Sequence, residues 1–353
     1  MRVRPDQPAH KAARLERTFI RAWLASVALV ATIVLLLDPL AQLGTGVVDP
    51  MTPNTRADRA DRASEASEPP DCLILGSSRI MGIDPARLEG LLPAGIRCEN
   101  AGVFTATVED LEVQYSLWSR SGHSTPRYVF VGVEQRMFHP TLETDVSLVL
   151  DPRLRRHENP QPGTQAVIEA ALSAVFGADT LDAVLRSVAV QLQPPTEPRF
   201  TMDERGALHW TRWENQIQRT GQAPAFLFEQ NVESWTRWHA GFGQGGDDRW
   251  RRWQNWLGQV TNSGARLIVF LPPEDERLRQ RVFEAVPSAA AAERAWVDRL
   301  ERSVQHAGGT WLDLRDSAAP EAPGDDSPRF YDGIHPRPEL ADQLTLRLAE
   351  AVH

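Results

Sequence analysis

The chain has 353 residues, enough for one large domain with an insertion or for two smaller domains. Its formal net charge of -9 argues against nucleic acid as a partner, because phosphate binding requires a concentrated basic face. Only 2 cysteines are present, which excludes a multi-bridge disulfide scaffold and a structural zinc site built from four cysteines.

The first feature along the chain is an uncharged apolar run from Ala22 to Leu37, which Phe19 and Ile20 extend past Arg21. Its length is near the roughly 20 residues that cross the hydrocarbon core of a bilayer. Basic residues precede it: Arg2, Arg4, Lys11, Arg14, Arg17 and Arg21. A cleaved signal peptide is the alternative, but the run is long for one, and no clean cleavage site follows it at once.

We therefore predict a basic cytoplasmic tail over residues 1–18 and a single uncleaved transmembrane anchor over 19–40 in the inner membrane. The positive-inside rule then places the C-terminal body in the periplasm. Residues 41–70 are predicted to be a disordered linker, because the stretch Asp49 to Pro70 is polar and offers almost nothing to bury.

From Asp71 onward, apolar runs alternate with helical patterns. The five expected strands are Cys72–Gly76, Gly95–Asn100, Arg127–Glu134, Ala265–Pro273 and Gly309–Leu314. Such alternation predicts a parallel sheet that is covered by helices on both faces, within one domain over 71–353. Residues 136–246 break the rhythm and are predicted to be a helical insertion packed over the edge of the sheet.

The first strand stops at Gly76 and is followed by Ser77 and Ser78. A strand, a glycine turn and a serine before a helix expose a hydroxyl at the carboxyl edge of a parallel sheet, where open sheets bind ligands. The same pattern is also found in ordinary strand-to-helix loops, so the hydroxyl alone does not define a site.

Further polar groups follow the other strands and precede the last helix. Asn100 and Gly102 follow the second strand, and Asp332 and His335 precede the C-terminal helix. A serine hydroxyl becomes a good nucleophile when an imidazole takes its proton, and a carboxylate fixes the imidazole tautomer. Backbone amides at Ser78 and Gly102 are candidate donors to an oxyanion. These groups together supply the parts of acyl-transfer chemistry.

This ordered set resembles the SGNH hydrolase superfamily, and in particular its membrane-anchored branch, which includes the D-alanyl-lipoteichoic acid transfer protein and alginate-type O-acetyltransferases. The Gly-Ser-Ser block matches 76–78, the Asn-x-Gly block matches 100–102, and the Asp-x-x-His-Pro block matches 332–336. The resemblance implies that Ser78 is the nucleophile and that His335 and Asp332 complete the triad. It also implies a flavodoxin-like three-layer α/β/α sandwich with a five-stranded parallel sheet of order 2-1-3-4-5.

The third block departs from the family pattern. It usually reads Gly-x-Asn-Asp, and its Asn donates to the oxyanion, whereas residues 132–135 read Gly-Val-Glu-Gln here. Glu134 would be a poor donor, so Gln135 or nothing fills this role. Because the membrane-anchored proteins that the chain resembles also tend to lose this Asn, the resemblance implies an envelope O-acyltransferase over a free esterase and leaves open a protein without hydrolytic activity.

Tryptophans form two groups of different character. Trp250, Trp253 and Trp256 recur every third residue, which is the spacing of a buried helical stripe. Trp210 and Trp213 are surrounded by polar residues and are candidates for a sugar-stacking groove above the serine, with core packing as the alternative.

Cys72 and Cys98 each stand four residues before a block glycine, which predicts that they lie side by side on neighbouring strands. An exported location permits a disulfide, but adjacent parallel strands fit one poorly, so both redox states stay open.

The resulting hypothesis is a membrane-anchored, exported serine esterase or O-acyltransferase that acts on acyl groups of a cell-envelope or exopolysaccharide glycan. Arg79 and Asn100 are further candidate substrate contacts. Expected partners are the glycan, the bilayer and a membrane-bound acyltransferase; neither a cofactor nor a metal is expected, since no phosphate-loop or His-Glu-x-x-His motif is present. A lipolytic or thioester-cleaving hydrolase and a catalytically silent scaffold of polysaccharide machinery are the alternatives.

Overall fold

The structure is a computed structural model that describes residues 7–47, 53–119, 125–192, 197–243, 246–318 and 328–352. Three parts of the predictions lie outside these residues: Arg2 and Arg4 of the basic tail, positions 48–52 of the predicted linker, and positions 193–196 and 244–245 of the predicted insertion. The chain divides into two compact units, each described here by itself. The larger unit comprises residues 55–148, 152–161 and 196–353, and the smaller unit comprises residues 1–54, 149–151 and 162–195.

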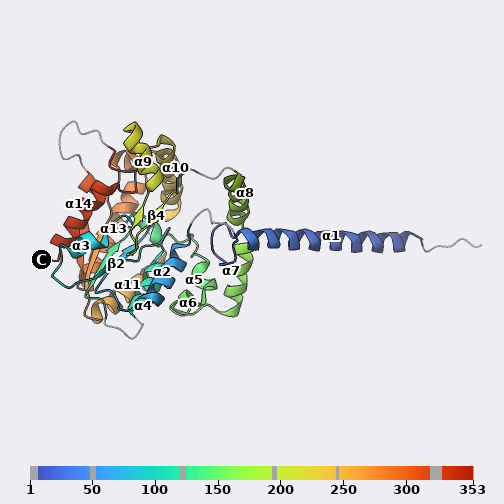
Figure 1. Ribbon diagram of the computed structural model, residues 1–353, viewed down its shortest axis with the longest axis horizontal. Helices are drawn as coiled ribbons and strands as arrows, with labels where there is room; N and C mark the ends of the chain where they lie inside the picture. Colours follow the sequence, from blue (N-terminus) through green and yellow to red (C-terminus); the bar gives the residue numbers. More distant parts are fainter. Residues whose placement is uncertain are drawn as a thin grey trace, which may run out of the picture. The chain divides into compact units, whose positions relative to one another are not determined.

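The larger unit is built on a five-stranded parallel sheet (Figure 1). Its strands are β1 (Cys72–Gly76), β2 (Cys98–Asn100), β3 (Tyr128–Gly132), β6 (Arg266–Leu271) and β7 (Thr310–Asp313). The predicted α/β class with a five-stranded parallel sheet is therefore confirmed. The strand order is β2-β1-β3-β6-β7 rather than the stated 2-1-3-4-5. Two short unpredicted strands, β4 (Thr201–Met202) and β5 (Leu208–His209), pair in a separate antiparallel hairpin before the fourth strand of the sheet begins.

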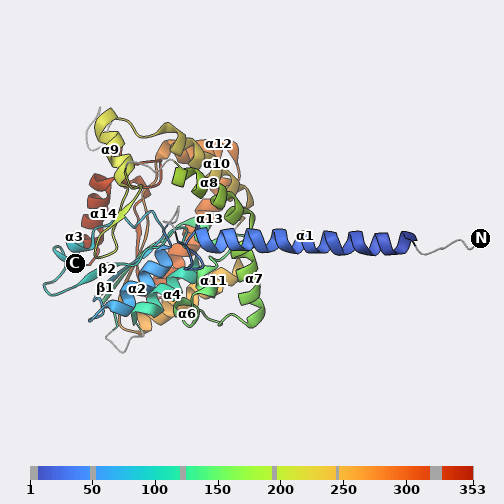
Figure 2. The same cartoon turned by 45° about the vertical axis from the view of Figure 1, so that its right-hand side comes forward.

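Alternate side chains of the strands point to opposite faces of the sheet, and each face has its own apolar core. Leu73 and Leu75 of β1 join one core, whereas Ile74 joins the other. The first core includes residues of α4 (Val108–Ser119), α11 (Asp247–Asn262) and α13 (Ala289–His306). The second includes residues of α3 (Pro85–Glu89) and α14 (Pro338–Glu350), which Figure 2 shows together on one side of the strands.

The predicted tryptophan stripe is confirmed as core. Trp250, Trp253 and Trp256 on α11 are 1%, 0% and 2% exposed. Phe138, in the 3-10 helix η1 (Gln135–Phe138), packs against Trp250 and Trp253 with ring centroids 4.4 and 5.7 Å apart.

The expectation of a disordered linker over 41–70 is wrong for part of the segment, because α2 (Thr55–Glu65) is a helix of the larger unit. Its arginines recur every third residue, so Arg56 and Arg59 share one face, and both are buried. Arg56 forms a two-pronged ion pair with Asp110 at 2.6 and 2.9 Å. The segment looked unable to bury anything because its buried face is charged and depends on partners far along the chain.

The insertion over 136–246 is helical as predicted, but it is divided between the two units. The larger unit contains its α6 (Pro152–Arg155), its β4–β5 hairpin, α9 (Thr211–Thr220) and α10 (Ala225–Phe242). Helix α10 packs against α12 (Glu276–Ala285) and α13 within that unit. Helix α5 (Ser147–Leu150) contains the point where the chain passes between the units, and the 3-10 helix η2 (Arg315–Ala318) follows β7.

The smaller unit contains α1 (Gln7–Leu37), α7 (Thr164–Phe176) and α8 (Ala178–Leu192). Residues Arg14–Leu37 of α1 form one helix that is long and apolar enough to span a membrane, with a mean hydropathy of 2.3. Helices α7 and α8 pack against each other and against α1. Figures 1 and 2 both show them beside its C-terminal end.

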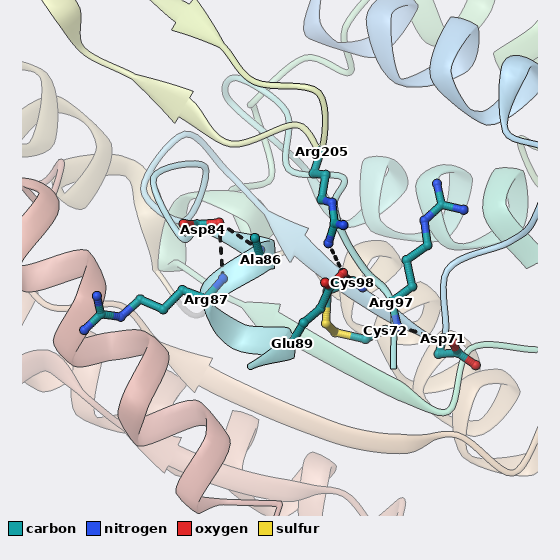
Figure 3. Close-up of a disulfide and its surroundings, with 9 residues drawn as sticks. All are labelled: Asp71, Cys72, Asp84, Ala86, Arg87, Glu89, Arg97, Cys98 and Arg205. Carbon is teal, nitrogen blue, oxygen red and sulfur yellow. Dashed lines mark hydrogen bonds and ion pairs between the residues drawn. A yellow bond between two sulfur atoms is a disulfide. The ribbon is translucent and has the colours of Figure 1, made fainter. Parts of the chain in front are cut away.

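The two cysteines are joined in a disulfide between paired positions of β1 and β2 (Figure 3). Both residues are fully buried. The Cys98 amide donates to Glu89 Oε1 at 2.7 Å, and Glu89 also forms an ion pair with Arg205 of the turn that joins β4 to β5. The disulfide thus fixes the edge strand β2 beside β1.

We predict that reducing the disulfide destabilises the folded state by roughly 2–4 kcal/mol, because the cross-link between positions 26 residues apart restricts the unfolded chain. Urea unfolding with and without dithiothreitol measures this, and the Cys72→Ala/Cys98→Ala variant is the control. That variant should not respond to dithiothreitol. An unchanged unfolding free energy of the reduced wild type would contradict the prediction.

Candidate active site

Three glycines at the carboxyl edge of the sheet form the support of the serine turn. Gly76 and Gly132 end the paired strands β1 and β3, and Gly102 follows β2. All three lie against Ile80. A Cβ atom would lie 2.8 Å from Ile80 Cγ1 at Gly76 and 2.6 Å from Ile80 Cδ1 at Gly102, and it would overlap Ile80 Cγ2 at Gly132. Ile80, with 0% exposure, thus fills a socket that only glycines leave open, and it fixes the turn that carries Ser78.

Asn100 holds the chain that follows this turn. Its side-chain nitrogen donates to the carbonyls of Ile80, Met81 and Ile83 at 3.0, 3.3 and 3.0 Å. Its side-chain oxygen accepts a hydrogen bond from the Gly102 amide at 3.1 Å. Asn100 is fully buried, so the expected substrate contact is corrected to a structural role. The Gly102 amide, an expected oxyanion donor, already has this acceptor.

The three predicted triad residues meet although Ser78 and His335 lie 257 positions apart. Ser78 Oγ lies 2.8 Å from His335 Nε2. His335 Nδ1 lies 2.6 Å from Asp332 Oδ2. Ser78 is half-buried, whereas His335 and Asp332 are 8% and 6% exposed. A hydroxyl, an imidazole and a carboxylate therefore form one continuous chain of hydrogen bonds with a partly accessible hydroxyl.

The charge of Asp332 decides the roles of the two imidazole nitrogens. Burial raises the pKa of the Asp332 carboxyl, but the His335 ring and hydrogen bonds from the His335 and Ile334 amides lower it below its ordinary value overall. An ionised Asp332 can only accept, so Nδ1 of His335 donates the proton. In the neutral ring Nε2 is then free to accept the Ser78 proton, which is the arrangement a general base requires.

Helix α9 of the insertion holds the loop that carries the base. Glu214 on α9 accepts hydrogen bonds from the Tyr331 hydroxyl at 3.0 Å and from Arg337 Nη2 at 2.8 Å. The Tyr331 amide in turn donates to the His335 carbonyl at 3.1 Å. The insertion therefore supports the loop that carries Asp332 and His335, instead of only covering the edge of the sheet.

Of the two candidate sugar-stacking tryptophans, the structure brings one to the triad. The Trp210 ring lies 4.3 Å from the His335 ring, centroid to centroid, and stacks on Tyr331 at 5.5 Å. Trp210 is only 7% exposed. It therefore packs beside the triad and has little ring surface on which a sugar could stack. Trp213 is half-buried and packs edge-on against Phe226 at 5.8 Å.

Arg79, a candidate substrate contact, is instead buried beneath the serine turn. Its guanidinium binds Glu274 Oε1 at 2.9 Å and the Pro273 carbonyl at 2.7 Å. It also lies over the Trp235 ring, 5.3 Å from the centroid. With 2% of its surface exposed, Arg79 has no face for a ligand, and the expectation is corrected to that of a structural ion pair.

Glu134 occupies the position at which the resembled family has its oxyanion-donating Asn. Burial raises the pKa of Glu134, but nearby Arg136 and Arg79, and a hydrogen bond from Ser77, lower it below its ordinary value overall. Arg136 and Arg79 lie 3.3 and 3.7 Å from its oxygens. Glu134 is thus an ionised acceptor with paired charge, and it cannot donate a hydrogen bond to an oxyanion.

Gln135, the expected substitute donor, is 8% exposed. It lines a small cavity of about 10 Å³ together with Arg79 and Trp235. Neither Ser78 nor His335 lines this cavity. No contact among the described residues brings the Gln135 amide to the serine.

Two side chains that support the candidate site were not identified from the sequence. Arg59 of α2 donates to the carbonyls of Gly102 and Gly206 at 3.1 and 2.8 Å and is fully buried. Glu214 binds Tyr331 and Arg337 and so holds the loop that carries His335, as described above. The arginine spacing in α2 was a usable signal for Arg59, whereas no local pattern distinguishes Glu214 from a solvated glutamate.

A cleft of about 1180 Å³ is lined in part by residues 328–333, which precede His335, but neither Ser78 nor His335 is among its lining residues. Most of its remaining polar lining is charged, contributed by Glu229, Glu274, Asp275, Glu276, Arg277, Arg279, Arg281, Arg315, Asp316 and Arg329. Apolar side chains, including Phe228 and Phe330, also line the cleft, so its lining is of mixed polar and apolar character.

No protein-family model matches the chain, and no curated protein matches its sequence.

The glycine socket leads to a test. We predict that Gly132→Ala lowers the unfolding free energy by about 1–3 kcal/mol, because its methyl group overlaps Ile80 and displaces the serine turn. Gly132→Ala should cost less in an Ile80→Ala background than in the wild type, since that background lacks the overlapping Cγ2 atom. Urea unfolding of both single variants and the double variant measures the coupling, and Gly258→Ala, where an added Cβ meets no atom and φ is not left-handed, is the control without overlap. If the losses of unfolding free energy in the two single variants add up strictly in the double variant, the predicted overlap between Ile80 and a side chain at position 132 is contradicted.

Proposed function

We propose that the chain is a membrane-anchored, exported serine esterase or O-acyltransferase of the SGNH type, with a flavodoxin-like sandwich as its catalytic domain. Its substrate would be an acyl group on a cell-envelope or exopolysaccharide glycan. The observation that carries the proposal is the hydrogen-bonded chain from Ser78 through His335 to Asp332. This geometry favours an enzyme over a silent scaffold, in which the three groups would have no need to meet.

In the proposed reaction, His335 Nε2 removes the Ser78 hydroxyl proton while Oγ attacks the acyl carbonyl carbon. The carbonyl electron pair moves to oxygen and returns when the bond to the leaving alcohol breaks, and His335 gives that alcohol its proton. Water or a glycan hydroxyl then attacks the acyl-serine with the same base. Ionised Asp332 stabilises the imidazolium that forms in each half-reaction.

The oxyanion site differs from the resembled pattern. Among the described residues, the Ser78 amide has no hydrogen-bond acceptor and is therefore free to donate. The Gly102 amide is bound to Asn100, and Glu134 replaces the Asn donor. Because each donor in such a hole is worth roughly 10²–10³ in rate, we expect slow turnover of simple esters.

The apolar helix α1 supports attachment to a membrane, with the basic flank inside and the larger unit outside. A membrane-bound acyltransferase is the proposed source of acyl groups if the reaction is a transfer.

We predict that Ser78→Ala and His335→Ala each lower kcat for p-nitrophenyl acetate by about 10³-fold or more, and that the double variant loses no more, because residues acting as a unit are non-additive. Asp332→Asn should cost less. Ser77→Ala, from the same turn, is the matched control and should retain most activity.

Three other outcomes decide between the alternatives. Loss of activity in Ser77→Ala but not in Ser78→Ala would overturn the assignment of the nucleophile. Rates that rise with acyl-chain length would favour a lipolytic hydrolase. A folded wild type that binds glycan but turns over no ester would favour the scaffold.

A further inference from the structure

Two helices of the smaller unit carry apolar stripes that face outward. On α7, Ile168, Leu172 and Phe176 follow each other at four-residue spacing and are 55%, 54% and 39% exposed. On α8 the stripe comprises Leu181, Leu185, Val188 and Leu192, which are 39%, 73%, 44% and 77% exposed. Spacings of three and four residues place each set on one face of its helix.

This exposure is confined to one part of the molecule. Apart from Phe226 and Leu346, every exposed large apolar side chain in the described residues belongs to the smaller unit. Contiguous apolar patches on a protein surface mark contact with a partner or a membrane, whereas scattered single residues do not. The exposed apolar stripes of the α7–α8 hairpin therefore indicate contact with a partner protein or with a membrane.

The buried sides of the two helices have the opposite character. Ala170 and Ala174 are the buried residues of α7, and Thr180, Ala183 and Ser187 are buried on and beside the same face of α8. Small residues inside and large apolar residues outside reverse the pattern of a water-soluble hairpin. They match the pattern of helices that meet within or against lipid, where small side chains allow close packing.

The position of the hairpin indicates which partner covers it. Helices α7 and α8 both pack against α1, the membrane-spanning candidate (Figures 1 and 2). The covered side chains of α1 lie toward its C-terminal end and include Val34, with 1% exposure. The hairpin therefore lies beside the C-terminal end of α1, where an anchor leaves the hydrocarbon core.

We propose that the α7–α8 hairpin is a second membrane contact, which lies in the interface of the bilayer leaflet from which α1 emerges and buries its apolar stripes among the acyl chains. The proposal rests on α1 being the anchor, which is part of the proposed function. Amphipathic helices of this kind insert about 5–10 Å into the boundary between headgroups and acyl chains.

The charges of the hairpin indicate how it binds. Residues 164–192 contain three acidic side chains, Glu169, Asp179 and Asp182, and one basic side chain, Arg186, which gives a net charge of -2. Asp182 and Arg186 pair at 2.7 Å on the exposed polar edge of α8. Attraction to anionic lipids cannot drive this contact, so it depends on apolar burial and should need neither anionic lipid nor low salt.

The test uses the full chain with its disulfide intact, reconstituted in phosphatidylcholine liposomes and labelled with a nitrobenzoxadiazole dye on one introduced cysteine. Three variants are compared: Leu185→Cys in the stripe, Arg186→Cys on the polar edge as the matched control, and Leu29→Cys within α1. Lipid nitroxides at a shallow and at a deep acyl position quench the dye according to its depth.

We expect Leu185→Cys to be quenched most by the shallow nitroxide, Arg186→Cys to be quenched weakly, and Leu29→Cys to be quenched most by the deep nitroxide. Added anionic lipid or high salt should not change this order. If Leu29→Cys is quenched and Leu185→Cys is not, the hairpin contact is overturned while the anchor stands. If Leu29→Cys is not quenched, the anchor itself fails.

Other partners for the apolar surface of the hairpin would give distinct results. A second copy of the chain would shift the dye at Leu185→Cys to the blue without lipid quenching, and dilution of the protein in lipid would reverse the shift. Either this result or quenching that disappears in high salt would contradict the proposal. Esterase activity is read separately on the same samples, so loss of the hairpin contact cannot be mistaken for loss of the triad.

Discussion

The geometry of the site depends on one packing constraint, the insertion of Ile80 into the space left by Gly76, Gly102 and Gly132. Three adjacent strands must end in register for this space to exist, and none of the three positions tolerates a side chain beside Ile80. The serine turn is therefore fixed by van der Waals contact with the sheet itself. Ser78 gains its orientation from a rigid scaffold, which is what a nucleophile requires for alignment with its base.

The second half of the site is supported by parts of the chain that lie far away in sequence. Glu214 of the insertion binds the loop that carries His335, and Arg59 of α2 binds the carbonyls of Gly102 and Gly206. Burial lowers the pKa of Arg59 to about 10, because the nearby carboxylates of Glu99, Asp58 and Asp203 offset its lost hydration only in part. These buried charged contacts join the linker segment, the sheet edge and the insertion into one unit.

Part of this could be predicted from the sequence. The runs at 72–76, 128–132 and 267–271 are consecutively apolar, so central parallel strands were recognisable, and the Asp-x-x-His-Pro spacing placed Asp332 against His335. The roles of Arg79, Asn100 and Gln135 could not be predicted, because each depends on partners that only the fold brings near. Helix α2 was missed for the same reason, since a charged helical face looks solvated until its partners are known. The short strands β4 and β5 carry no extended apolar pattern.

The central claim is that Ser78 is a nucleophile activated by His335, and the most direct measurement is the site of covalent attachment of a fluorophosphonate. Peptide mass spectrometry of the labelled, folded protein should find the phosphonyl group on Ser78, and the His335→Ala variant should label far more slowly. Attachment to Ser77, or no adduct in a protein that is shown to be folded, would contradict the account.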